Sequence, residues 1–155
     1  LCIKQRVFAW TDTYDVYDRN GEALYYVKNE FLSLGHQIHV YDSRTGEEVG
    51  AVCQRLLTFL PKFDIELGGK TLGTISREFS FLQPRYRVDF RDWDVEGDFL
   101  QWDYSVYQGN RQVMTISREL LTWGDTYMLR CDDPRDTLPG LLLVIAIDAA
   151  NCGNN

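Results

Sequence analysis

The segment Leu141–Ala150, LLLVIAIDAA, is apolar on every side and carries one charged side chain, Asp148. A helix without a polar face is buried either in a protein core or in lipid. A membrane-spanning helix needs about 20 apolar residues, and this segment has roughly half that number. We therefore predict a buried hydrophobic helix at about residues 137–151 and no transmembrane segment.

Most of the chain before this helix has the pattern of short strands joined by tight turns. Apolar and polar residues alternate on both sides of Asn20-Gly21, a pair that favours a two-residue hairpin turn. Further hairpins are predicted across residues 43–47, 68–69 and 109–110. Such short connections join antiparallel neighbours, because parallel strands need long crossovers.

A strand–bend–strand unit recurs along the chain, beginning at Gly50, Gly73 and Met114, and the sequence TISRE occurs at both 74–78 and 115–119. The spacings between the units differ, so we interpret them as duplications within one sheet and not as an extended repeat array. The corresponding apolar positions are Val52, Ile75 and Ile116 in the first strand, Leu56, Phe79 and Leu120 at the bend, and Phe63, Tyr86 and Tyr127 in the second strand.

The strands and the helix together predict the fold class. About twelve antiparallel strands need a closed arrangement to avoid exposed edges, and the side chains of so wide a barrel do not easily fill it. The hydrophobic helix would fill the interior. We predict a single domain over residues 1–155 that is mainly β (α+β), a closed antiparallel β-barrel of about 12 strands around a central hydrophobic C-terminal helix.

The sequence from Glu96 to Asp136, followed by LLLVIAIDAA, closely resembles the LURP-one-related proteins, which belong with the tubby C-terminal domain and the phospholipid scramblases. The resemblance extends from IKQRVFAW to Cys152. It implies a tubby-like twelve-stranded barrel around a C-terminal helix and no established enzymatic activity. Tubby domains bind phosphoinositide head groups, and scramblase relatives act at membranes. The residues that carry the resemblance are Gly97-Asp98-Phe99, Trp102-Asp103-Tyr104, Ile116-Ser117 and Trp123-Gly124-Asp125-Thr126-Tyr127.

Charge and motifs exclude several classes of function. The net charge of −7 disfavours broad binding to nucleic acid, so no nucleic-acid partner is expected. The sequence has no G-x-S-x-G element, no phosphate-binding loop and no C-x-x-C pair. We therefore expect no enzymatic activity, no catalytic residues, no cofactor and no metal site.

The best candidate ligand site is a group of basic residues: Lys62, Arg85, Arg87 and Arg91. The three arginines share one strand parity, so a straight strand would place them on one face. Clustered cationic donors of this kind suit the phosphates of an anionic head group. Asp89 has the same parity and opposes the interpretation, which leaves a solvated strand face as the alternative.

Asp148 is the second candidate, because a bare carboxylate inside an apolar helix is costly. It must pair, lose its charge, or lie at the mouth of the barrel. One interpretation is an acid bonded to a strand backbone or an arginine. The other is a group that responds to protons or to a ligand in a pocket beside the helix.

The leading hypothesis is a non-enzymatic tubby-like binding or scaffold module, cytoplasmic or peripheral at a membrane. Its ligand would be a phosphoinositide or another anionic lipid, or a protein partner. The alternative is a small-molecule carrier or cryptic enzyme with a pocket beside the central helix near Asp148. A third hypothesis is a purely structural or signalling interaction protein.

Overall fold

The computed structural model describes residues 1–4, 13–32, 35–121 and 124–152, and within these ranges it contains a twelve-stranded sheet, a short 3-10 helix and one long α-helix. Trp123 lies outside the described residues. The elements are β1 (Cys2–Lys4), β2 (Thr13–Tyr17), β3 (Ala23–Leu32), β4 (Gly35–Asp42), β5 (Glu48–Gln54), β6 (Lys62–Leu67), β7 (Lys70–Glu78), β8 (Arg85–Val88), β9 (Trp93–Asp98), β10 (Asp103–Gln108), β11 (Arg111–Leu121), β12 (Gly124–Cys131), η1 (Pro134–Asp136) and α1 (Thr137–Cys152).

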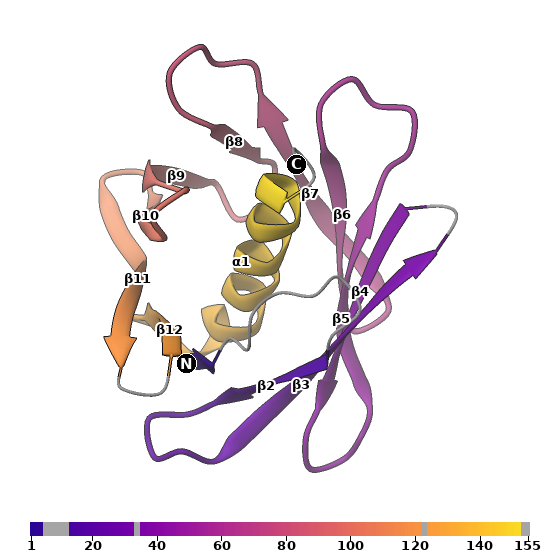
Figure 1. Ribbon diagram of the computed structural model, residues 1–155, viewed down its shortest axis with the longest axis vertical. Helices are drawn as coiled ribbons and strands as arrows, with labels where there is room; N and C mark the ends of the chain where they lie inside the picture. Colours follow the sequence, from indigo (N-terminus) through magenta and orange to yellow (C-terminus); the bar gives the residue numbers. More distant parts are fainter. Residues whose placement is uncertain (5–12, 33–34, 122–123, 153–155) are drawn as a thin grey trace.

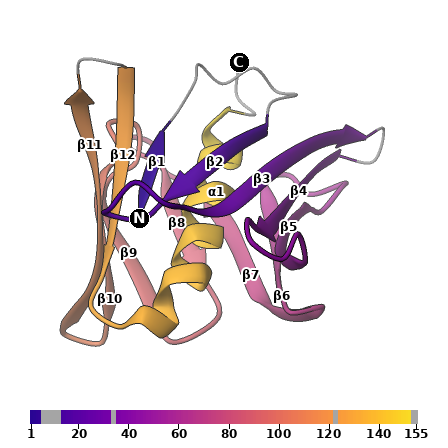
Figure 2. The same cartoon turned by 90° about the horizontal axis from the view of Figure 1, so that it is seen from below.

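The sheet wraps around α1, as Figures 1 and 2 show. Its strand order is β8-β7-β6-β5-β4-β3-β2-β1-β12-β11-β10-β9, and the pairs are antiparallel. The first and last strands of the chain are therefore neighbours, while β8 and β9 form the two ends of the order. Within the described part of the chain, no hydrogen-bonded ladder joins β8 to β9. The prediction of twelve antiparallel strands around a C-terminal helix is confirmed, and a closing ladder is not found.

Turn residues explain the local course of the chain. Gly21, Gly68, Gly69 and Gly109 have positive φ, which a glycine adopts without a steric penalty. The hairpins predicted at these positions are confirmed as β2–β3, β6–β7 and β10–β11.

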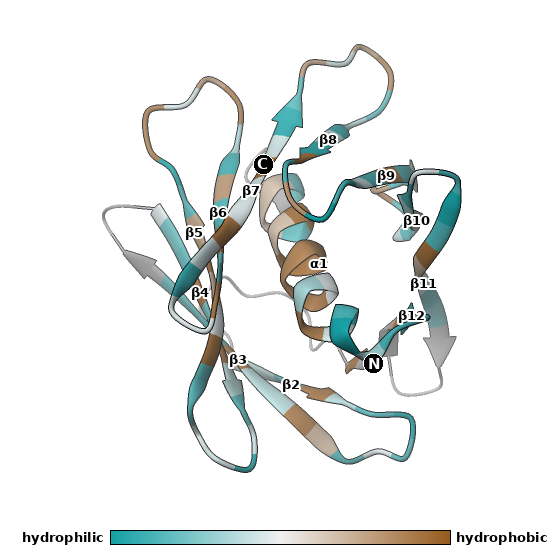
Figure 3. Ribbon diagram, turned by 180° about the vertical axis from the view of Figure 1, so that it is seen from behind, coloured by the Kyte–Doolittle hydropathy of each residue, from teal (hydrophilic) through white to brown (hydrophobic). Residues whose placement is uncertain are grey.

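The core forms between α1 and the inner face of the sheet. Every residue from Leu141 to Ala150 is buried, so the helix has no solvent-facing side in this stretch. Figure 3 shows α1 inside the curve of the sheet, with much of its length in the brown of hydrophobic residues. The helix ends one residue beyond the predicted range. Among the described residues, no helix is both long enough and apolar enough to span a membrane.

The repeated unit supplies much of the sheet's part of the core. All six of its apolar strand positions, from Val52 to Tyr127, are buried. Its bend positions behave differently, because Leu56 and Phe79 are exposed; the side chain of Leu120 lies outside the described residues. The repeat therefore carries core residues in its strands and exposed apolar residues at two of its bends.

Candidate functional site

The connections between strands give the molecule two chemically different ends. Consecutive antiparallel strands place alternate connections at the same end. The connections 55–61, 79–84 and 99–102 thus share the end at which α1 terminates, as Figure 1 shows for the first two. We call these three segments the apolar end. The opposite, polar end carries turns such as DRNGE (18–22) and SRTGE (43–47).

The apolar end exposes large hydrophobic side chains at the tips of its loops. Phe59, Phe81 and Leu82 are 96%, 91% and 94% exposed, and the ring of Phe79 packs edge-on against Phe81 with centroids 4.9 Å apart. Soluble monomers rarely gather such side chains in one place without a binding role. The exposed large hydrophobic residues of the described chain are Tyr26, Leu56, Leu57, Phe59, Phe79, Phe81, Leu82 and Leu100, and all except Tyr26 belong to the apolar end.

A row of polar and basic residues crosses the outer face of the sheet beside this end. Lys62 of β6 is in register with Ser76 of β7, and Ser76 is in register with Arg87 of β8. Arg85 lies on the same exposed face of β8 and is in register with Glu78. We call Lys62, Arg85 and Arg87 the basic row. Residues 51–88 contain six basic and three acidic side chains, whereas the whole chain has a net charge of −7.

The ion pairs of the basic row are too few and too exposed to prevent it from binding a ligand. The Nε of Arg87 lies 3.1 Å from Oε1 of Glu78, with both side chains exposed. Ion pairs this exposed are weak, typically below about 1 kcal/mol. For Lys62 and Arg85, no ion pair is found among the described residues.

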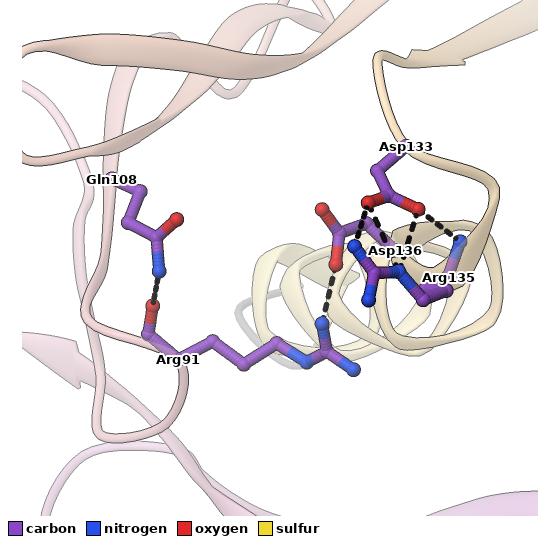
Figure 4. A network of polar contacts seen from close by, with 5 residues as sticks. All are labelled: Arg91, Gln108, Asp133, Arg135 and Asp136. Carbon is purple, nitrogen blue, oxygen red and sulfur yellow. Dashed lines mark hydrogen bonds and ion pairs between the residues drawn. The ribbon is translucent and has the colours of Figure 1, made fainter.

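Arg91, the fourth predicted member, lies elsewhere. It occupies the turn after β8 with a φ of 58°, so strand parity does not extend to it. Its guanidinium pairs with Asp136 of η1, and its carbonyl oxygen accepts a hydrogen bond of 3.0 Å from Nε2 of Gln108 (Figure 4). The structure thus brings Lys62, Arg85 and Arg87 to one face and places Arg91 at the polar end.

Asp89 limits the charge of this face, as its parity suggested. Burial raises the pKa of its carboxyl group, but hydrogen bonds from the backbone and the hydroxyl of Thr74 outweigh burial, and the pKa is lowered. The charge of Lys62 lowers the pKa further. Asp89 is therefore an anion close to Lys62. Its charge would repel a phosphate at Lys62 more strongly than at Arg85 and Arg87.

Asp148 lies inside the molecule, where it is 9% exposed. Burial, and after it the charge of Asp148, raises the pKa of both Tyr14 and Tyr104. The acid therefore lies close to the buried Tyr104 and the partly buried Tyr14. Three surface hollows lined by described residues do not include Asp148 among their lining residues.

The largest of these hollows, about 1160 Å³, lies between β8 and β9 beneath the 79–84 loop. Its lining includes Phe81, Tyr86, Glu96 and Phe99, so it joins the apolar end to the boundary between the two strands. The rings of Tyr86 and Phe99 touch edge-on, with centroids 4.9 Å apart. The groove is thus continuous with the exposed apolar loops.

The apolar loop residues were missed as functional residues by sequence reasoning, which interpreted them as bends of the repeated unit. The available signal was a run of apolar side chains that ends in proline, LLTFLP at 56–61 and FSFLQP at 79–84. Proline favours chain segments outside regular strands. Several large apolar residues in such a segment have no sheet face against which to pack.

The fold and this surface define a class of protein in which an antiparallel sheet encloses an apolar helix and presents hydrophobic loops beside a basic strand face. The chain belongs to the LURP-one-related family, whose family model matches residues 1–148. It is 29% identical over 148 residues to the uncharacterized protein YxjI of Bacillus subtilis (strain 168). The alignment covers 96% of this chain and 91% of that protein.

A solved structure is similar in fold. The X-ray structure of a protein from Arabidopsis thaliana matches with a TM-score of 0.61, covering 95% of this chain and 89% of that one. The two sequences are 18% identical, so this likeness concerns the fold alone.

Proposed function

We propose that the protein is a non-enzymatic docking module that binds the surface of an anionic phospholipid membrane through its apolar end and its basic row. The observation that carries this proposal is the position of the protruding loop tips, among them Phe59, Phe81 and Leu82, beside the basic segment 51–88 of an acidic chain. The protein would then be cytoplasmic and peripheral at the membrane.

The chemistry of the two features fits a bilayer surface. Apolar side chains that enter the boundary between head groups and acyl chains gain the free energy of removal from water. Each basic side chain near an anionic surface contributes about 1 kcal/mol. The tips of Phe59 and Phe81 protrude from two separate loops, and a deformable bilayer accepts such tips without a preformed pocket.

Co-sedimentation with vesicles tests this function. The wild-type protein should bind vesicles of phosphatidylcholine mixed with phosphatidylserine or a phosphoinositide, and bind phosphatidylcholine alone weakly. The double variant Phe81→Ser, Leu82→Ser should lower the partition coefficient about tenfold or more, because it removes two inserting side chains. Tyr26→Ser is the matched control, since it removes an exposed ring outside the apolar end.

A charge variant separates the contribution of the basic row. Arg85→Gln should weaken binding to anionic vesicles at low salt and have a smaller effect at high salt, where surface charges are screened. Absence of wild-type binding to every anionic vesicle at low salt would contradict the proposed function. Binding that all apolar-end and basic-row variants retain would contradict the assigned surface.

A further inference from the structure

The boundary between β8 and β9, which we call the seam, begins at a turn that fixes a register. Arg91 and Asp92 have φ values of 58° and 51°, and the backbone N–H of Trp93 donates to the carbonyl oxygen of Phe90 over 3.3 Å. Two consecutive central residues with positive φ are the geometry of a type I′ turn, the usual start of a two-residue β-hairpin.

This turn dictates which residues of the two strands would lie opposite each other. Continued from the pair Phe90 and Trp93, the hairpin register places Val88 opposite Val95, Arg87 opposite Glu96, and Arg85 opposite Asp98. The side chains of Val88 and Val95 face inward and are partly buried, whereas Arg87 and Glu96 are exposed on the outer face. Opposite charges directly across two strands stabilise their pairing, so the sequence favours a zipped seam.

Among the described residues no backbone ladder joins β8 to β9, but contacts at both ends keep the two strands close to each other. At the polar end, the turn is tied to η1 by the Arg91–Asp136 ion pair (Figure 4). At the apolar end, the amide of Asn151 on α1 accepts a hydrogen bond from the hydroxyl of Tyr86 and donates one of 3.3 Å to the carbonyl oxygen of Phe99. Both strands are thus fastened to the helix, while the groove remains between them.

We propose that β8 and β9 act as a latch on the basic row. When the seam zips, Glu96 pairs with Arg87 and Asp98 with Arg85, which withdraws both guanidinium groups from the head groups of a membrane. When the seam is open, as in this structure, the ion pair found for Arg87 within the described part of the chain is the exposed one with Glu78. The latch concerns regulation of the docking surface and to that extent rests on the proposed function.

Two neutralising variants of β9 test the latch against a general effect of charge. Glu96→Gln removes the partner of Arg87 and should raise the affinity for phosphatidylserine-containing vesicles roughly two- to fivefold, the range of an exposed ion pair. Asp94→Asn is the matched control, because it neutralises an exposed acid of the same strand, one that the hairpin register would place opposite Asp89. Because Asp94→Asn removes the repulsion between these two acids, it favours the zipped seam. The affinity of this variant for the vesicles should therefore stay unchanged or fall. An equal rise in both variants would overturn the latch and leave membrane docking intact.

A cross-link tests the seam without any membrane. Arg87 and Glu96 would form a non-hydrogen-bonded pair, whose Cα atoms lie about 4.5 Å apart, a spacing that a disulfide accepts. The variant Arg87→Cys, Glu96→Cys should form this disulfide on mild oxidation, as identified by peptide mass mapping, whereas the out-of-register pair Arg85→Cys, Glu96→Cys should not. Failure of the in-register pair to cross-link would overturn the latch. If the in-register pair cross-links but the wild-type protein does not bind anionic vesicles, the seam does zip. That combination of results would overturn the role of the seam in docking and contradict the proposed function.

Discussion

At the scale of single residues, burial determines how the described cysteines behave. Cys131 lies at the end of β12 and is partly buried. Burial is the main reason that the pKa of its thiol rises from 9.0 to about 11, with the charge of Asp136 adding to the rise. The thiolate is the reactive form, so at pH 8 the reactive fraction should be about a hundredfold smaller than for an ordinary thiol.

We therefore expect slow alkylation of Cys131 by iodoacetamide in the folded protein. Peptide mass mapping at successive times measures the rate for this residue alone. The same chain in denaturant provides the control, because there the thiol is exposed and its pKa returns to the ordinary range. Equal rates in the folded and unfolded chain would contradict this prediction.

Asp133 shows the opposite shift. A side-chain hydrogen bond from Arg135, followed by the backbone N–H of the same residue, lowers the pKa of Asp133 from 3.8 to about 2. Because the folded pKa is depressed, the stabilising contribution is present above the ordinary pKa and is lost as the pH falls through about 2. Carboxyl chemical shifts in an NMR titration should give a midpoint near 2 for Asp133. Arg135→Gln should move that midpoint upward, and an unchanged midpoint would show that Arg135 is not the cause.

At the scale of elements, Gly50 permits the close contact between β5 and α1. An added Cβ would lie 2.9 Å from Cδ1 of Leu142 and 3.0 Å from the carbonyl oxygen of Glu66. Gly50→Ala should therefore lower the free energy of unfolding by about 1–3 kcal/mol, as overpacking usually does. Chemical denaturation measures the loss. Thr71→Ala, at an exposed position of β7, is the control and should change the value by less than about 0.5 kcal/mol.

The elements also show how far the sequence predicted the fold. Hairpins whose turns contain glycine, such as Asn20-Gly21, were predictable because glycine marks the positive φ directly. The buried helix was predictable because no solvent-exposed or membrane-spanning alternative suits Leu141–Ala150. The turn at Arg91-Asp92 carries no glycine or asparagine, so its positive φ values leave little trace in the sequence. The strand parity that grouped Arg91 with Arg85 was wrong for this reason.

At the scale of the whole molecule, the candidate surface depends on information that local patterns lack. The loops 55–61 and 79–84 are separated by two strands in the chain, and only the alternation of the sheet places them at the same end. The row from Lys62 to Arg87 likewise exists only through the register of three neighbouring strands. Sequence reasoning grouped the arginines by strand parity, but it had no means of relating them to the exposed apolar tips.

The last prediction also concerns the whole molecule, because the sheet curves around α1. Ile145 lies in the middle of the helix and is 4% exposed. Ile145→Asp would bury a carboxylate with no preformed partner, and an uncompensated interior charge costs several kcal/mol. That is comparable with the net stability of about 5–15 kcal/mol that a folded domain has. We expect no cooperative thermal transition for this variant in near-ultraviolet circular dichroism.

Ile145→Val separates the effect of charge from the effect of shape. This variant removes one methylene group from the same site and should lower the free energy of unfolding by only about 0.5–1.5 kcal/mol, with a cooperative transition retained. If Ile145→Asp instead melted cooperatively near the wild-type temperature, the centre of α1 would have to be accessible to water. The helix could then not be the element on which the curvature of the sheet depends.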